Sequence, residues 1–288
     1  MMKRSRVLAV LLAAVLLVPG TGPSAPAPAS ASAAASVDYR CVMDAFGHTA
    51  SGRIKFRRVV NSRVTASKAT AGTFAWRPMA WGLVSSNRWP GYEYSEQIVA
   101  STDGRIRLVS TEFRTSSSNL RVRVLKVVGS GYPSRLVAFD EFSLFWVAAD
   151  HSLNRATWNG RRLTNPTKLP VTITGARAMT AKGSDRGMHV YYTDTRGRFH
   201  VVTDKGAATT DIVLRQSSGF ATTTGLRAGY CHTPNYAGIR SYLGILAVNR
   251  ETGGGRFLRA LRPDSADGGS LTSSTRVSPA GWTWRRLG

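Results

Sequence analysis

Arginines set inside short apolar segments are the residues of this chain best suited to binding chemistry. Five such segments occur, and their arginines are Arg77, Arg135, Arg177, Arg227 and Arg285. Guanidinium groups form paired hydrogen bonds with phosphate or carboxylate, so arginines that share a centre would make an anion-binding funnel. In the alternative interpretation they point between neighbouring sheets and bond to backbone carbonyls or turn aspartates. We favour this structural role, which repeated polar residues often have.

Aromatic residues are the second kind of candidate, because flat rings stack on the apolar faces of sugars while nearby polar groups fix the orientation. Trp89 and Tyr92 belong to a predicted loop, Asn87–Tyr92, whose composition is unlike that of a core strand. Trp158 begins a second turn, Trp158-Asn159-Gly160. We predict that Trp89, Tyr92 and Trp158 bind ligand, and that most other aromatic residues pack in the core.

Carboxylates would be needed for glycoside hydrolysis, in which a pair of them acts as acid and base or nucleophile. The available groups are Asp140 with Glu141, Glu93 with Glu96, and Asp38 and Asp44 near the first strand. The chain has no Gly-x-Ser-x-Gly, no His-Glu-x-x-His, no phosphate-binding glycine loop and no metal-ligand spacing of Cys and His. We predict no catalytic residue, no metal and no cofactor, with a glycan-cleaving enzyme as the alternative.

The elements that position these residues repeat along the chain. An apolar strand, an Asp or Asn at the turn, usually Gly-Arg, and a second apolar strand recur five times. The predicted turn residues are Asp44, Asp103, Asp150, Asp194 and Asn249. The residues that open the second strand are Ile54, Ile106, Leu153, Phe199 and Phe257. They are 52, 47, 46 and 58 residues apart. Periods near 50 residues are typical of propellers and solenoids.

A ring explains where the repeat is incomplete. The first hairpin, around Ile54, has no arginine segment before it, whereas the last arginine segment, Trp282–Arg285, has no hairpin after it. If the last strand completes the first blade, no sheet edge is left free. The period-two pattern of Arg105–Leu108 is expected to direct Arg toward water and aliphatic side chains toward the next blade. We predict an all-β, five-bladed β-propeller closed by the C-terminal strand, with a β-sandwich as the alternative.

The N-terminus indicates export. Three basic residues within Met1–Arg6 precede the apolar run Val7–Val18, and Pro19-Gly20 then leads into an Ala/Pro/Ser tract, as in a secretory signal peptide. The run is short for a membrane span, which takes about 20 apolar residues. We predict a signal peptide and cleavage region over residues 1–36, a single propeller domain over 37–288, no transmembrane segment, and an extracellular, secreted protein.

The two cysteines, Cys41 and Cys231, both follow the predicted signal peptide. An oxidising destination favours a disulfide between them. They lie in the first and fifth repeat units, which are neighbours only if the ring closes. We predict the bond, and two buried free thiols are the alternative.

The charge balance indicates acidic partners. The sequence has 39 Lys and Arg against 16 Asp and Glu, a net charge of +23. Outside a cell, such a surface attracts phosphate-bearing wall polymers, acidic polysaccharides and lipid headgroups. GC-rich coding also enriches Arg, so the charge alone leaves a specific polyanion open. We predict no specific nucleic acid as partner.

The motif "apolar strand, Asp, Gly-Arg, apolar strand", recurring over residues 38 to 288, resembles that of the tachylectin-type five-bladed propellers, a lectin family. The resemblance covers the architecture, and no sugar-binding residue matches position by position. It implies binding of amino sugars or other glycans in pockets between blades. We expect a monomeric, non-catalytic binding protein for carbohydrate or for an anionic cell-envelope polymer. A glycan-cleaving propeller and a scaffold for another protein are the alternatives.

Overall fold

A computed structural model describes residues 39–132, 136–140, 142–184, 187–205, 208–232, 242–263, 265–284 and 287. The chain divides into two units, residues 1–37 and 38–288, and all described residues belong to the second. The predicted signal peptide, Arg135 and Arg285 lie outside the described residues. In the described ranges, no helix has the length and hydropathy needed to cross a membrane.

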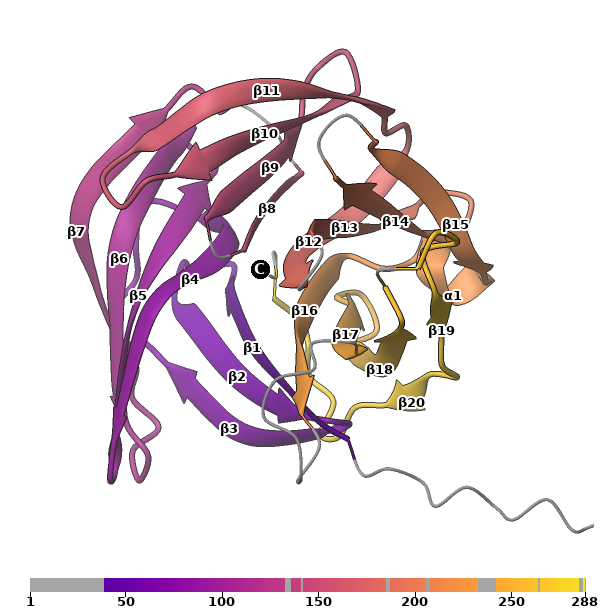
Figure 1. Cartoon of the computed structure of the whole chain (residues 1–288). Coiled ribbons are helices and arrows are strands. Elements are labelled where there is room, and N and C mark those ends of the chain that lie inside the picture. Colours follow the sequence, from indigo (N-terminus) through magenta and orange to yellow (C-terminus); the bar gives the residue numbers. More distant parts are fainter. Residues whose placement is uncertain are drawn as a thin grey trace, which may run out of the picture. The chain divides into compact units, whose positions relative to one another are not determined.

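Strands dominate the described residues, which contain one short helix, α1 (Ser218–Ala221) (Figure 1). Three antiparallel sheets have four consecutive strands each. The first contains β4 (Pro78–Trp89), β5 (Tyr92–Ser101), β6 (Arg105–Arg114) and β7 (Arg121–Ser130). The second contains β8 (Val137–Asp140), β9 (Ser143–Val147), β10 (Ser152–Trp158) and β11 (Leu163–Thr172). The third contains β12 (Ala176–Ser184), β13 (Gly187–Asp194), β14 (Arg198–Asp204) and β15 (Thr210–Gln216).

The fourth sheet of the described residues has eight strands and joins the two ends of the domain. Its first arm consists of β1 (Arg40–His48), β2 (Ile54–Val60) and β3 (Arg63–Ala69). Its last arm consists of β16 (Gly225–His232), β17 (Tyr242–Asn249), β18 (Gly254–Leu261), β19 (Ser270–Leu271) and β20 (Thr275–Arg276). The repeat units of the sequence therefore correspond to the three separate sheets and these two arms.

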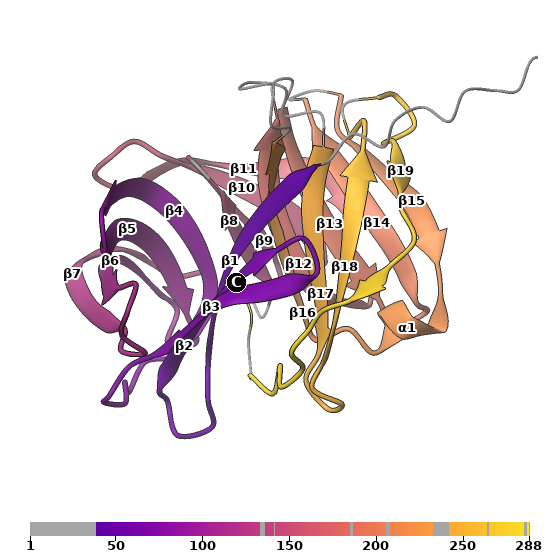
Figure 2. The same cartoon turned by 90° about the horizontal axis from the view of Figure 1, so that it is seen from below.

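The strands that follow or contain the predicted arginines, β4, β8, β12 and β16, are innermost together with β1. β4 contacts β8, β8 contacts β12, β12 contacts β16, and β1 contacts both β16 and β4. Figure 1 shows the sheets following one another around a common centre, and Figure 2 shows the β4–β7 sheet and the β12–β18 strands on either side of β1. The sheets are thus arranged like the blades of a propeller.

The hydrophobic core consists of separate clusters, each between two successive sheets or arms, because one sheet can bury an apolar face only against its neighbour. Phe56 and Trp81 belong to the cluster between the first arm and the β4–β7 sheet. The next clusters follow in order, and the last one, which includes Met43, Leu246 and Trp282, lies between the two arms. The first and last repeat units therefore share a core.

Turn chemistry accounts for most of the repeated Asp and Asn residues. At four hairpins the side-chain oxygen accepts a hydrogen bond from the backbone N–H two residues later, at 2.8 to 3.2 Å; the residues are Asp103, Asp150, Asp194 and Asn249. This satisfies a backbone donor in the turn. Asp44 is an exception, because it lies inside β1 opposite Arg58 of β2.

The link between the two arms is β1 paired with β16. Cys41 and Cys231 are cross-strand partners there and form the predicted disulfide. Gly229 of β16 allows the close approach, since a Cβ at this position would lie 2.0 Å from the carbonyl oxygen of Val42.

The predicted closure by a C-terminal strand requires a correction. After β20, the described residues pair with the first arm only through isolated bridges, Gly47 with Leu287 and Arg63 with Ser278. Trp282 and Trp284 are buried in the cluster between the arms. The C-terminal segment therefore contacts the first unit, as expected. It does so by packing the indole rings of Trp282 and Trp284 between the arms and not by adding a strand to the sheet.

Candidate functional site

Arg77 and Arg177, two of the predicted arginines, line the same cavity. It has a volume of about 530 Å³ and lies where β4, β12 and β16 begin and β1 ends. Arg250, which follows β17 and was not predicted from the sequence, is the third arginine of its wall. We call this space the arginine cavity; its remaining lining residues are His48, Thr102, Thr223 and Thr224.

Arg227 has the structural role. Its Nε donates a hydrogen bond to the carbonyl oxygen of Asp44 at 2.8 Å, and its Nη1 donates to that of Trp81 at 2.7 Å. Burial lowers the pKa of Arg227, and the charges of Asp140 and Asp44 oppose this shift. The side chain thus ties β16 to β1 and β4.

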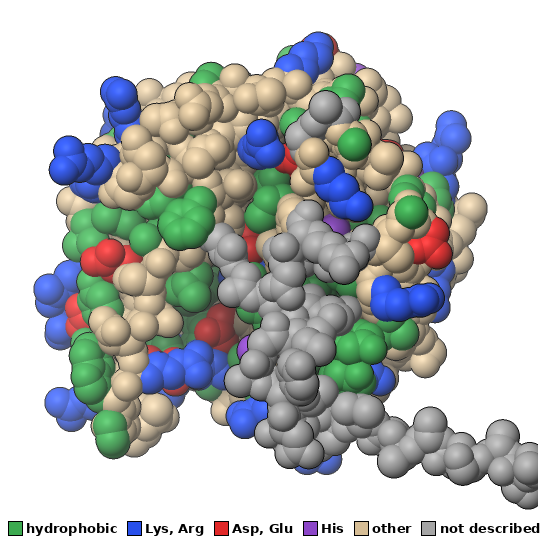
Figure 3. Space-filling model, viewed as in Figure 1, with side chains coloured by type: hydrophobic (Ala, Val, Ile, Leu, Met, Phe, Trp, Pro, Cys, Tyr) green, Lys and Arg blue, Asp and Glu red, His purple; other side chains and the backbone are tan. Residues whose placement is uncertain are grey.

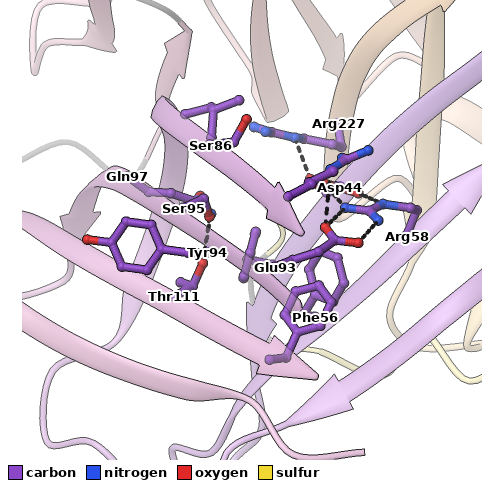
Figure 4. Close-up of a pocket in the computed structure, with 14 residues that line it drawn as sticks. Asp44, Phe56, Arg58, Ser86, Glu93, Tyr94, Ser95, Gln97, Thr111 and Arg227 are labelled. Atoms are coloured by element: carbon purple, nitrogen blue, oxygen red, sulfur yellow. Dashed lines mark hydrogen bonds and ion pairs between the residues drawn. The ribbon is translucent and has the colours of Figure 1, made fainter. Parts of the chain in front are cut away.

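The second candidate space is the Arg58 pocket, of about 70 Å³, between β1–β2 and the β4–β7 sheet (Figure 4). Arg58 binds Asp44 through Nε and Nη2 at 2.7 and 2.8 Å, and it binds Glu93 through Nη1 and Nη2 at the same two distances. Figure 4 shows the three side chains pointing toward one another, with Arg227 beside them. The pocket has room for a few waters and is far below the 300 to 1,000 Å³ of usual ligand sites.

Electrostatics in this pocket do not favour acid catalysis. Burial alone raises the pKa of Glu93, but hydrogen bonds from Arg58 and its charge outweigh burial and lower the pKa below its usual value. A general acid in a glycosidase needs the opposite shift. Every carboxyl shift resolved in the described residues is downward, at Glu93, Asp103, Asp150, Asp194 and Asp267.

The other predicted carboxylates also have structural partners. Asp140 is buried and accepts hydrogen bonds from Lys182 Nζ at 2.6 Å and from the backbone N–H of Gly183 at 2.8 Å. Glu96 accepts from the hydroxyl of Tyr94 at 2.9 Å. Asp38 and Glu141 lie outside the described residues.

The third candidate space is the Tyr92 groove, of about 620 Å³, between the end of β3 and the β6–β7 hairpin. Phe74, Tyr92 and Phe113 give it aromatic walls, while Glu112 and Arg121 line it with opposite charges. The hydroxyl of Tyr92 donates to Glu112 Oε2 at 3.0 Å, and Arg121 Nη1 lies 3.6 Å from the same oxygen. An apolar wall beside fixed polar groups is the composition of a sugar site.

Trp89 lies next to Tyr92 and is not itself one of the residues that line this groove. It ends β4, its ring centroid lies 5.6 Å from that of Tyr92, and the residue is 53% exposed. The two residues flank the β4–β5 turn. The segment that was predicted as a loop is therefore the solvent-exposed end of the β4–β5 hairpin.

The wall of the Tyr92 groove is held by β3. The buried amine of Lys68 donates to the carbonyl oxygens of Arg114, Thr115 and Ser117 in the β6–β7 turn. Backbone hydrogen bonds also join Ala69 to Ser118 and Leu120, at 3.0 and 2.9 Å. The groove is therefore preformed, which lowers the entropic cost of binding.

Trp158 does not line a site. Only 2% of this residue is exposed, and its ring lies in the cluster between the β4–β7 and β8–β11 sheets. A ligand in solution cannot stack on a buried ring, so the prediction that Trp158 binds ligand does not agree with this structure. Trp158 ends β10, and its side chain points to the core while the following Asn159-Gly160 forms the turn.

On the face shown in Figure 3, Lys and Arg lie both at the outline of the domain and inside it, and they do not form one continuous patch. The arginine cavity is therefore distinguished by the convergence of its arginines on one space.

Comparisons with known proteins find only distant similarity. No protein-family description and no curated protein matches the chain. Aleuria aurantia lectin, a fungal six-bladed β-propeller with a novel fucose recognition mode, is 11% identical over 83% of this chain and 78% of its own, with a TM-score of 0.42. A variant of that lectin in complex with Fucα1-6GlcNAc is 11% identical over 84% and 79%, with a TM-score of 0.45.

The WD40 domain of SCAP from fission yeast is 9% identical over 76% of this chain and 52% of its own, with a TM-score of 0.34. Similarity at this level does not assign a function to this chain. The resemblance to tachylectin-type propellers stays a prediction.

Proposed function

We propose that this chain is a secreted, non-catalytic carbohydrate-binding protein and that the Tyr92 groove is its sugar site. The observation that carries the proposal is the exposed ring of Trp89 next to Tyr92, whose hydroxyl is held by Glu112 at the edge of a groove of about 620 Å³. Such rings stack on the apolar face of a pyranose, and Glu112 and Arg121 would bind its hydroxyls. The groove lies between two successive units, where the resemblance to propeller lectins places glycan pockets.

Other features support the remaining parts of this proposal. The disulfide between Cys41 and Cys231 is stable in an oxidising compartment, as expected of a protein with a signal peptide over residues 1–36. Packing of Trp282 and Trp284 between the arms supports a five-bladed ring in which the C-terminal segment completes the first unit. In this proposal residues 37–288 form one propeller, which acts as a monomer.

A glycan array tests the function. The purified protein is applied at low and at high salt, and bound glycans are analysed by mass spectrometry after prolonged incubation. We expect a restricted set of glycans to bind with little dependence on salt and to be recovered intact. Binding that falls steeply with salt for all acidic glycans would indicate diffuse charge attraction. That result, a shortened glycan or the absence of binding would contradict the proposal.

A further inference from the structure

The arginine cavity carries an inference that does not depend on the Tyr92 groove. Its three arginines come from different repeat units: Arg77 precedes β4, Arg177 lies in β12, and Arg250 follows β17. The three positions are far apart in sequence, and the ring of sheets brings their side chains to one space. No Asp or Glu is among the described residues that line it.

The positive charge of this cavity is uncompensated within the described part of the chain. None of the three guanidinium groups forms an ion pair there. Nη1 of Arg77 is buried against Gly52 and has no hydrogen-bond partner among the described residues, so this nitrogen is closed off from solvent. An anion in the cavity would offset the repulsion between the three positive charges that line it.

One of the three arginines is placed by the surrounding structure. The guanidinium of Arg77 packs against Gly52, where a Cβ would overlap it. The backbone N–H of Arg250 donates to Thr224 Oγ1 at 2.8 Å, which fixes the backbone there. The side chains of Arg250 and Arg177 are exposed and can adjust to a ligand. The cavity thus combines a fixed part with an adaptable one.

We propose that the arginine cavity is a binding site for a phosphate group, either as free phosphate or as a phosphate ester. A tetrahedral oxyanion with about two negative charges has several acceptor oxygens for the converging guanidinium groups. A single carboxylate would match fewer donors and less charge. The volume of about 530 Å³ lies within the range of small-molecule sites and exceeds the needs of a bare ion, so a phosphorylated sugar or polyol also fits.

Isothermal titration at constant ionic strength tests this site with inorganic phosphate, glycerol 3-phosphate and acetate as probes. The test variant combines Arg177→Gln and Arg250→Gln, because both residues are exposed. The matched control combines Arg161→Gln and Arg162→Gln, which removes the same charge from the exposed β10–β11 turn. Thermal unfolding of both variants verifies that they fold.

We expect at least one phosphate probe to bind the wild type at least tenfold more tightly than acetate. The cavity variant should weaken that binding at least tenfold, and the control variant less than twofold. Tighter binding of glycerol 3-phosphate than of phosphate would assign the site to an ester, and tighter binding of phosphate would assign it to the free ion. The absence of phosphate binding, equal weakening in both variants, or equal affinity for acetate would overturn the proposal.

Discussion

Cys41 and Cys231 lie directly opposite each other on β1 and β16, and their disulfide joins strands 190 residues apart in sequence. In the described residues, β1 and β16 pair only at these two cysteines and at Arg40 with His232. The two arms therefore depend on the disulfide and on their shared core, more than on a continuous ladder of hydrogen bonds.

Removal of the disulfide should weaken the junction of the arms. We expect Cys41→Ala combined with Cys231→Ala to lower the free energy of unfolding by about 2 to 5 kcal/mol, because the unfolded chain regains the freedom of a long loop. Urea unfolding of the oxidised wild type and of the double variant measures the difference. Equal stability of the wild type and the double variant would mean that packing between the arms holds them together without the disulfide.

Two of the arginines predicted from the repeat should respond differently to substitution. Arg227→Met leaves the carbonyl oxygens of Asp44 and Trp81 without their donor, at a cost of about 1 to 3 kcal/mol each. Arg177→Gln alters an exposed side chain and should change stability by less than about 0.5 kcal/mol. Thermal unfolding of the two variants measures the difference. Equal losses of stability would contradict a structural role for Arg227 that Arg177 does not share.

Acid should weaken the contact between Asp103 and Arg107. Hydrogen bonds from Arg107 hold the pKa of Asp103 at about 2, below its usual 3.8. A lowered folded-state pKa means that the stabilisation is complete well above pH 3.8 and is lost as the pH falls toward 2. The difference in melting temperature between wild type and Asp103→Asn should therefore be largest at neutral pH and shrink from about pH 4 to pH 2. A difference that does not vary with pH would exclude an ionised Asp103 as its source.

Loss of Arg58 should be costly because it leaves two carboxylates facing each other. In an Arg58→Met variant, Asp44 and Glu93 lose their shared cation. We expect the pKa of Glu93 to rise and stability at pH 7 to fall by about 3 to 5 kcal/mol, with partial recovery at pH 4 to 5 as a carboxylate is protonated. Unfolding experiments across this pH range measure the recovery, and a loss independent of pH would indicate that Arg58 acts through packing alone.

The repeat predicted the strands well because hairpin turns and apolar periods are local properties. It misplaced Asp44, since β1 continues past this residue and the turn falls near Thr49–Arg53. The pairing of Asp44 with Arg58 depends on the register between β1 and β2, which a single sequence does not reveal.

Arg107 shows a second limit of the periodic pattern. The alternation predicted that it would face water, yet it is buried and binds Asp103 Oδ2 at 2.6 Å. Ile106 belongs to the cluster with the β8–β11 sheet, whereas Arg107 lies 5.3 Å from the ring centroid of Trp76, which packs on the cluster with the first arm. The two side chains thus alternate as expected, and Arg107 is buried because this sheet has a neighbour on both faces.

Candidate sites were harder to predict than strands. The composition around Trp89 and Tyr92 revealed an exposed hairpin, but the groove beside it also needs Phe74 and Glu112 from other elements. Likewise, Arg250 becomes a candidate because the arrangement of the sheets places it in the wall of the same cavity as Arg77. Convergence of distant residues is a property of the tertiary structure.

The most direct test of the account is the dissociation constant of the tightest-binding array glycan for the Trp89→Ala variant. Phe142→Ala is the matched control, because Phe142 is 60% exposed and lies between β8 and β9, in a different sheet from Trp89 and Tyr92. A stacking ring typically contributes more than about 1.4 kcal/mol, a factor of ten in affinity. We predict that Trp89→Ala weakens binding at least tenfold while Phe142→Ala leaves it within twofold. Unchanged binding by Trp89→Ala, or an equal loss in both variants, would contradict the assignment of the sugar site.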